Sequence, residues 1–291
     1  MKIYILLLLF YSSVFAISDY VFSGTNISAN AGAITSAKSS SDLFYQNPAF
    51  LNEIKNNLIK ANYSNLYGQD FLENQSVIVH LNNNKLGNIG IYFNKNSVTY
   101  IHDLISEQQF CISKGFNLQV DENSTLGLGF SINYYSLKYG KSAGVNGDGT
   151  LGSIAEQNIS QFGIDFGVLS TLRNNYRFGA FIKNINSPQI GNGASAQYLP
   201  RRISISTTYS PIEVFSLTFE LENEMGKEMQ IQSGIQYDII PQLKLLTGIQ
   251  VNPNRFGFGL IYNNYNFEIG WSVITHPVLF NTHSFSVGYN F

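Results

Sequence analysis

The feature of this sequence that most constrains its fold is an alternation between apolar and polar or small residues, which recurs along most of the chain. Between residues 265 and 273, one set of alternate positions is Tyr265, Phe267, Ile269, Trp271 and Val273, and the other is Asn266, Glu268, Gly270 and Ser272. Residues 283–291 are sorted in the same way, and no helical spacing competes in these windows. Because successive side chains of a strand point to opposite faces, each stretch predicts a strand with one apolar and one polar face.

The composition indicates what these two faces meet. Charged residues make up 12% of the chain and aromatic residues 14%. A soluble β-sandwich also alternates, but its polar faces meet bulk water and usually carry many more Lys and Glu. Lipid around a polar, small-residue interior fits the composition better. We therefore predict an all-β protein, a transmembrane antiparallel up-and-down β-barrel of the bacterial outer membrane.

Fourteen stretches can be assigned as strands, an even number as expected for single-chain bacterial barrels. They lie near residues 58–67, 71–81, 86–94, 105–120, 124–138, 159–172, 175–185, 200–210, 213–223, 229–239, 242–251, 254–262, 264–273 and 280–291. All seven prolines fall in turns, at strand edges or in the N-terminal segment, where a missing N–H breaks no ladder bond. If both termini are periplasmic, the connections 95–104, 139–157 and 186–199 are extracellular, the side on which longer loops are expected.

Several outward positions refine this barrel. An aromatic girdle is predicted near its periplasmic end, on the apolar face, from Tyr176, Tyr209, Tyr237, Tyr262, Tyr265 and Tyr289. Tyr289 and Phe291 end an alternating strand, a feature that the barrel-assembly machinery reads, so we expect them to form the membrane-insertion signal. Lys114 falls on the lipid face, where a midplane Lys costs about 2–4 kcal/mol. Either a bulge shifts the register there, or the side chain snorkels to the interface.

The two ends of the chain suggest a division into three parts. Residues 1–16 have a basic start, a short apolar run and small residues before a cleavage site after Ala16, which predicts a secretory signal peptide. No later stretch approaches 18 apolar residues, which excludes an α-helical membrane protein. Residues 17–57 do not alternate, and residues 58–291 form the predicted barrel. The net charge of −2 gives no indication of a nucleic-acid partner.

The segment before the first strand carries a recognisable motif. A small, polar stretch at 23–33 leads into Asp-Leu-Phe-Tyr-Gln-Asn-Pro-Ala-Phe-Leu at 42–51. This pattern resembles the PorV/PorQ family, relatives of the FadL-type transporters of hydrophobic compounds, and the positions that match are Asp42, Tyr45, Asn47, Pro48, Ala49 and Leu51. The last strand resembles that family as well, although Ser284 and Asn290 stand where an arginine is common.

The resemblance implies that residues 17–57 fold into the lumen as a plug or hatch. A fourteen-strand lumen is too wide for wall side chains alone to fill, so a compact insert is physically reasonable. The alternative is a disordered periplasmic lead-in. Asp42 would accept hydrogen bonds from backbone N–H groups or pair with an inward-facing base, for which the candidates are Arg177, Lys183, Arg202, Lys244 and Arg255.

Inward-facing carboxylates are predicted to pair with inward Arg and Lys and so hold the lumen together; they are Asp165, Glu220, Glu222, Asp238 and Glu268. A general acid and base pair is the alternative interpretation of the same residues. The four histidines show no metal-ligand spacing. His283 and Ser284 are neighbours in a strand and therefore point to opposite faces, which argues against a catalytic dyad. We expect no enzyme, no metal and no cofactor.

Three functions remain open at this stage. The PorV/PorQ resemblance implies a role in protein secretion or cell-surface assembly, with secreted proteins or a type IX translocon as partners in addition to outer-membrane lipid and the barrel-assembly machinery. The FadL-type relationship implies a conduit for small hydrophobic molecules. A structural surface protein is the third alternative.

Overall fold

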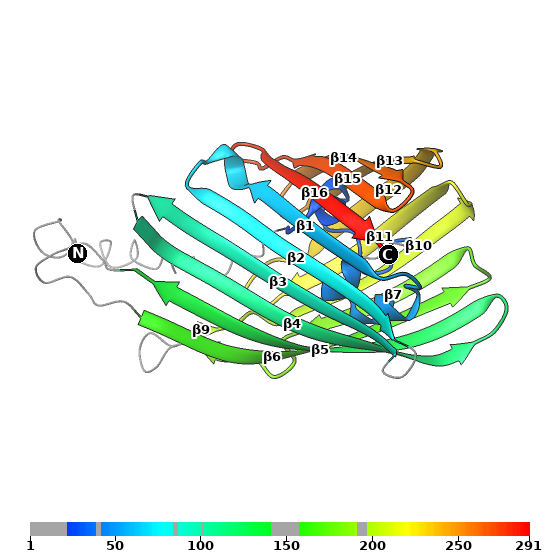
Figure 1. The fold of residues 1–291 in the computed structure, drawn as a ribbon, viewed down its shortest axis with the longest axis horizontal. Helices are drawn as coiled ribbons and strands as arrows, with labels where there is room; N and C mark the ends of the chain where they lie inside the picture. The colour runs from blue at the N-terminus through cyan, green and yellow to red at the C-terminus, as the bar shows by residue number, and fades with distance from the viewer. Residues whose placement is uncertain (1–21, 39–41, 84–86, 101, 141–156, 191–196) are drawn as a thin grey trace, which may run out of the picture.

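The computed structural model describes residues 22–38, 42–83, 87–100, 102–140, 157–190 and 197–291. The predicted signal peptide, residues 1–16, lies outside these residues. Fourteen antiparallel strands close into a barrel (Figure 1). They are β1 (Leu58–Asn65), β2 (Leu72–Asn83), β3 (Gly87–Tyr100), β4 (His102–Val120), β5 (Ser124–Tyr139), β6 (Gln157–Leu172), β7 (Tyr176–Lys183), β10 (Arg202–Ile212), β11 (Phe215–Glu224), β12 (Gln230–Ile240), β13 (Leu243–Val251), β14 (Arg255–Asn264), β15 (Phe267–Ile274) and β16 (Thr282–Asn290).

Each strand pairs with the barrel strands before and after it in the chain, and β1 pairs with β16 to close the barrel. The predicted fold class and the strand count of fourteen are therefore confirmed. Two short strands, β8 (Gln189–Ile190) and β9 (Gln197–Tyr198), form a separate hairpin between β7 and β10. Strands β5 and β7 end, and β6 and β10 begin, at the end of the barrel opposite the C-terminus, and the two longest stretches between barrel strands, 140–156 and 184–201, connect them.

The predicted loop at 95–104 is wrong. Strand β3 continues to Tyr100 and β4 begins at His102, with Ser97 paired to Ser106 and Val98 to Ile105. Pairing continues here although the stretch is rich in polar residues and carries no clean apolar face. A prediction based on an apolar face therefore ends β3 too early and begins β4 too late.

The outer face of the barrel is apolar and the inner face polar. On β10, Ile203, Ile205 and Tyr209 are exposed, whereas the alternate residues Ser204 and Ser206 are buried inside. Tyr176 stacks on Tyr209 from the neighbouring strand, with ring centroids 4.9 Å apart. Neighbouring tyrosines thus pack against each other near the end at which the chain finishes.

Two outward positions need comment. Tyr265 is 99% exposed and lies in the tight turn between β14 and β15 with a φ of 51°, so its prediction as a strand-face residue is wrong. Lys114 does lie on the outer face, paired in register with Ile89 and Phe130. The nearest irregularity of β4 comes after Asn117, so no bulge shifts Lys114 inward. Its ammonium instead lies 5.5 Å from the ring centroid of Phe116, as a snorkelling side chain would.

The described residues before β1, 22–38 and 42–57, lie inside the barrel (Figure 1). They contain α1 (Thr25–Ala29) and the 3-10 turns η1 (Leu43–Tyr45) and η2 (Pro48–Asn52), and a third such turn, η3 (Leu66–Gly68), connects β1 to β2. Helix α1 contacts β13 to β16, whereas η2 contacts β3 to β6 on the other side of the lumen. We call the described residues 22–38 and 42–57 the inner segment. No helix in the described part of the chain is long and apolar enough to cross a membrane.

The inner segment supplies most of the buried apolar cluster of the molecule. Its residues Ile27, Leu43, Phe44, Phe50 and Leu51 are buried together with wall residues that include Tyr92, Cys111 and Leu169. Glycines on the inner wall allow this close approach. A Cβ at Gly129 would lie 2.2 Å from the carbonyl carbon of Pro48, and one at Gly179 would lie 2.4 Å from the carbonyl oxygen of Thr35.

Candidate functional site: the inner segment and its contacts with the wall

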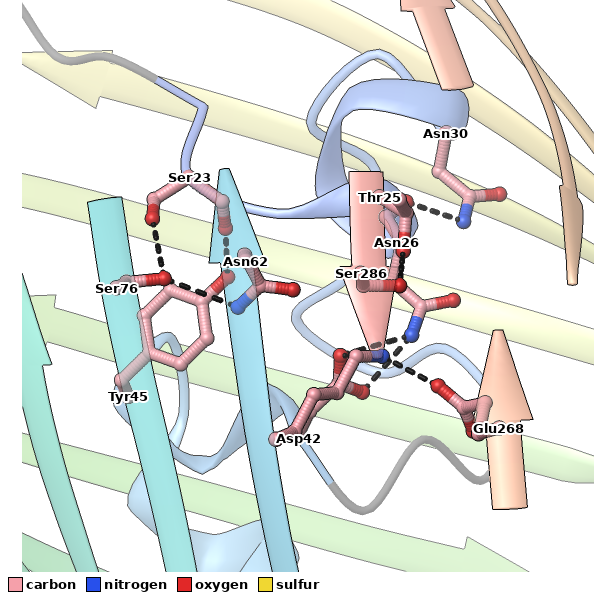
Figure 2. Close-up of polar contacts among 11 residues, drawn as sticks. Ser23, Thr25, Asn26, Asn30, Asp42, Tyr45, Asn62, Ser76, Glu268 and Ser286 are labelled. Atoms are coloured by element: carbon pink, nitrogen blue, oxygen red, sulfur yellow. Dashed lines mark hydrogen bonds and ion pairs between the residues drawn. The ribbon is translucent and has the colours of Figure 1, made fainter. Parts of the chain in front are cut away.

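A buried ion network joins the inner segment to two wall strands (Figure 2). The ammonium of Lys60 on β1 lies 2.6 Å from Oδ2 of Asp42, and it also pairs with Glu268 on β15. The side-chain amide of Asn26 donates hydrogen bonds of 2.8 and 3.0 Å to the two oxygens of Asp42. The Lys60 side chain is 1% exposed and that of Asp42 is 5% exposed. Charges as buried as these need partners to offset the cost of leaving water.

Local sequence explains how this network assembles. Lys60 is an inward member of the alternating strand β1, between buried Leu58 and Asn62. In the register of the wall, Gly288 lies opposite Lys60 on one side and opposite Glu268 on the other. Lys60 and Glu268 therefore lie on either side of Gly288, and they meet across β16.

This network corrects the prediction for Asp42. The expected partners were Arg177, Lys183, Arg202, Lys244 or Arg255, whereas the ion pair in the structure is with Lys60. The sequence did contain a signal for Lys60, because the alternation of β1 already places this residue on the inner face. What the sequence did not show was which of the inward bases lies beside Asp42.

A second contact uses the carboxylate of Glu220 on β11. It accepts hydrogen bonds from the backbone N–H groups of Ile34 and Thr35, both at 2.8 Å, and from the hydroxyl of Thr35 at 2.6 Å. Glu220 was predicted to pair with an inward Arg or Lys, yet its hydrogen bonds go to the backbone and hydroxyl of the inner segment. The carboxylate thus accepts hydrogen bonds from buried backbone N–H groups of the inner segment, which do not take part in the hydrogen bonding between the barrel strands.

Two arginines make further contacts from β7 and β10. Arg177 lies 2.7 Å from Glu53 and donates a 3.0 Å hydrogen bond from Nε to the carbonyl of Ser36. Arg202 donates to the side-chain oxygen of Gln46, and its Nε lies 3.5 Å from Glu222 in the wall. Arg177 thus links two parts of the inner segment that are far apart in sequence.

The other predicted inward charges have varied surroundings. Asp165 accepts hydrogen bonds from the side chain of Asn133 and from the backbone of Asn184, at 2.7 and 2.8 Å. Lys183 lies in register with Arg202, and Lys244 with Asp238. The guanidinium of Arg255 lies 5.5 Å from the ring centroid of Phe22 of the inner segment.

The six motif residues of the inner segment lie close to the wall or in the buried cluster. Tyr45 stacks on Tyr92 of β3 with centroids 4.2 Å apart, and its hydroxyl donates to the carbonyl of Ser23 (Figure 2). The Asn47 side chain accepts a bond from Ala49 N–H and donates to the carbonyls of Thr35 and Val168. Pro48 begins η2, while Ala49 and Leu51 are buried.

The proposed insertion residues lie at the end of the last strand. Tyr289 is exposed on the outer face, and Phe291 is exposed beyond the end of β16. Their rings are stacked with centroids 6.2 Å apart, and the N–H of Phe291 donates to the carbonyl of Asn57.

Within the described residues, no group of three or more His, Cys, Asp and Glu side chains is arranged to hold a metal ion. His283 is exposed on the outer face, and Ser284 is buried inside, where its hydroxyl bonds to Ser64. These two residues therefore cannot act as a dyad. A cavity of about 140 Å³ lies against the inner segment near the end opposite the C-terminus, and its lining includes Tyr45, Tyr92, Leu137, Lys183, Leu199 and Arg202.

Comparison with known proteins identifies both family and fold. The family model described as type IX secretion system membrane protein PorP/SprF matches residues 40–291. A search of curated proteins found no significant match to the sequence. These comparisons do not show the narrower PorV/PorQ assignment.

Solved structures of transporters share the fold. The Pseudomonas putida toluene transporter TodX is 11% identical with a TM-score of 0.62, over 94% of this chain and 98% of that one. A Pseudomonas aeruginosa FadL homologue is 10% identical with a TM-score of 0.60, over 93% and 99%. The Ralstonia pickettii toluene transporter TbuX is 10% identical with a TM-score of 0.58, over 96% and 100%. The family is thus that of type IX secretion system membrane proteins, and the barrel fold is shared with these solved structures.

Proposed function

Since this chain belongs to the PorP/SprF family of type IX secretion system membrane proteins, we propose that it is an outer-membrane component of that machinery whose lumen is closed by the inner segment. In this proposal the barrel binds exported proteins or other parts of the translocon and does not pass solutes. The proposal takes the C-terminus to be periplasmic; this is supported by the two longest connections between barrel strands, which follow β5 and β7 at the ends of those strands that lie away from the C-terminus.

The observation that carries the proposal is the spread of charged contacts between the inner segment and the wall. Lys60, Glu220, Arg177 and Arg202 reach it from four different strands, and Glu268 on a fifth strand pairs with Lys60. Removing one partner from a buried ion pair costs about 3–5 kcal/mol. A hatch that left the lumen in every transport cycle would have to break several such contacts at once. A stationary insert suits a binding component better than a solute channel.

A conduit for small hydrophobic molecules is the second candidate. It is supported by the cavity of about 140 Å³ beside Tyr45, which Tyr92, Leu137 and Leu199 line with apolar surface. The fold shared with the toluene transporters is consistent with it. A conduit would need the inner segment to move or the barrel wall to open beside this cavity.

The narrower PorV/PorQ assignment stays a prediction. It is supported by the motif at 42–51, whereas the matching family model supports only the broader placement in type IX secretion.

Export and conductance together test the proposal. Loss of the gene should abolish export of type IX cargo, and the full chain should restore it. In planar bilayers the intact protein should stay closed, and a folded variant lacking residues 17–57 should open a water-filled path. If that deletion does not fold, Asp42→Asn combined with Glu220→Gln weakens two contacts while keeping the segment.

Two results would overturn the proposal. One is normal cargo export without the gene, together with uptake of a small aromatic hydrocarbon that depends on it, which would favour the conduit. The other is a folded deletion variant that conducts no more than the intact protein, which would show that the inner segment does not close the lumen.

A further inference from the structure

Two cavities lie on the same side of the lumen, one at each end of strands β12, β13 and β14. The cavity at the C-terminal end has a volume of about 320 Å³, and its lining includes Gln236, Lys244, Asn263 and the exposed residues Lys55 and Asn56. The cavity at the opposite end has a volume of about 520 Å³, and its lining includes Gln230, Asn252, Arg255 and the exposed residues Lys227 and Glu228. Both cavities therefore reach exposed residues, and polar side chains make up most of each lining.

A short stretch of the inner segment fills the lumen between these cavities. Residues 28–32, which we call the barrier segment, lie against glycines of β13 and β14. A Cβ at Gly248 would lie 2.2 Å from the carbonyl carbon of Asn30, and one at Gly257 would lie 2.3 Å from the carbonyl oxygen of Ser28. Gly248 and Gly257 are paired in the register, and on each strand they lie between the residues that line the two cavities. The backbone of the barrier segment thus occupies the space between the cavities.

The described contacts hold the barrier segment to the wall less firmly than the residues that follow it. The backbone N–H groups of its last three residues donate to carbonyls within the inner segment itself. The hydroxyl of Ser28 lies 3.4 Å from that of Ser284 on β16, a long contact between two neutral groups. Thr35, in contrast, donates to the carboxylate of Glu220 from both its N–H and its hydroxyl. Because hydrogen bonds to charged groups are roughly twice as strong as neutral ones, the barrier segment can shift from the wall more easily than Thr35.

Buried acceptor groups beside the barrier segment are suited to polar solutes. Gln232 and Gln250 are 1% and 3% exposed, and they are paired in the register of β12 and β13. The amide of Gln232 lies against Gly32, since a Cβ on this glycine would be 2.8 Å from it. Within the described residues, Oε1 of each glutamine accepts no hydrogen bond. Buried acceptors of this kind favour a water molecule or a solute that donates one. The wall at this point therefore suits N–H or O–H groups better than apolar molecules.

We propose that a path for small hydrophilic solutes and ions runs along β12, β13 and β14, and that the barrier segment closes it. A shift of the barrier segment away from the glycines joins the two cavities. The flanking residues stay in place, because Asn26 before the segment is bonded to Asp42 (Figure 2). After the segment, Thr35 stays bonded to Glu220. The proposal rests on the closure of the lumen by the inner segment proposed above, and it adds a state in which these solutes pass.

The charges around the two cavities indicate weak ion selectivity. In each lining, two carboxylates are balanced by two Lys or Arg side chains. They are Glu53, Glu268, Lys55 and Lys244 at the C-terminal end, and Glu224, Glu228, Lys227 and Arg255 at the opposite end. Because neither mouth of the path carries an excess of one sign, neither cations nor anions are concentrated there.

Conductance in planar bilayers tests the path with a matched pair of variants. The methyl group of Gly257→Ala would lie 2.3 Å from the carbonyl oxygen of Ser28, so the barrier segment must shift, and this variant should conduct ions where the intact protein stays closed. The control is Gly179→Ala, whose methyl group would lie 2.4 Å from the carbonyl oxygen of Thr35. This contact on β7 does not lie between the two cavities, and the control should therefore stay closed. In a gradient of potassium chloride, the current of Gly257→Ala should reverse close to zero voltage, as weak selectivity requires.

Heat-modifiable migration on gels checks that each variant has folded. If Gly257→Ala does not fold, Gly248→Ala takes its place, because it acts on the same segment from β13. The proposal is overturned if the folded variant stays closed while a variant lacking residues 17–57 conducts, if Gly179→Ala conducts as well as Gly257→Ala, or if the current is strongly selective for one sign of charge. A deletion variant that also stays closed would instead refute the closure of the lumen on which the proposal rests.

Discussion

Replacing Lys60 by methionine should destabilise the barrel more than any surface lysine replacement. Methionine keeps most of the length of the side chain but removes the charge that lies between Asp42 and Glu268. The change leaves two carboxylates facing each other across Gly288 without a cation between them. The perturbation is therefore the creation of uncompensated buried charge, with little loss of packing.

The structure sets the size of the effect. Glu268 is 16% exposed and lines a cavity at the C-terminal end of the barrel, so water screens part of its charge. Asp42 is more deeply buried, and Asn26 still donates its two hydrogen bonds to it. We expect a loss of about 3 kcal/mol, at the lower end of the range for breaking a buried pair. Each 1.4 kcal/mol is a factor of ten, so the unfolded fraction should rise more than about a hundredfold.

Urea unfolding in lipid vesicles, followed by the ratio of folded to unfolded bands on unboiled gels, measures this free energy. Adding Asp42→Asn to Lys60→Met removes one of the two carboxylate charges and should recover about 1–2 kcal/mol, a coupling expected of residues in direct contact. Lys138→Met, at an exposed position of β5, is the control and should change stability by less than about 0.5 kcal/mol. A single variant that costs under about 1 kcal/mol, or a double variant no more stable than the single one, would refute the reasoning.

Three further outcomes are expected. Unboiled protein should migrate differently from boiled protein on gels, because a closed barrel pairs its backbone groups and resists detergent; identical migration of the two samples would contradict the fold. Lys114→Met should raise the unfolding free energy by up to about 2 kcal/mol in urea titration, less than a midplane lysine costs, because the side chain already snorkels over Phe116; a loss of stability would disprove this placement. Gly129→Val should expose the inner segment to protease, since a Cβ there would lie 2.2 Å from Pro48, and unchanged protection would argue against the tight contact.

The strands were predictable because their cause is local. An outer face in lipid and a polar inner face force an alternation that the sequence records directly, and the fourteen predicted stretches match the fourteen barrel strands. The prediction failed where that cause is absent. At 95–104 the strands carry no clean apolar face, and at Tyr265 the alternation continues through a turn.

The contacts of the inner segment were less predictable, because they depend on how a folded insert meets a curved wall. The alternation places Lys60 and Glu220 on the inner face, but it does not say that one meets a carboxylate and the other meets backbone N–H groups. Those partners lie 18 to 208 positions away along the chain. Only the register of the whole barrel brings them together.

The inward-facing glycines are the wall residues whose role the sequence pattern predicts least. In an alternating strand, an inward glycine is equivalent to any other small residue, and the sequence gives no reason to single it out. In the barrel, Gly129 and Gly179 let the backbone of the inner segment touch the wall. These glycines matter because they have no side chain. That role can be recognised only when the structure shows which part of the inner segment occupies the space.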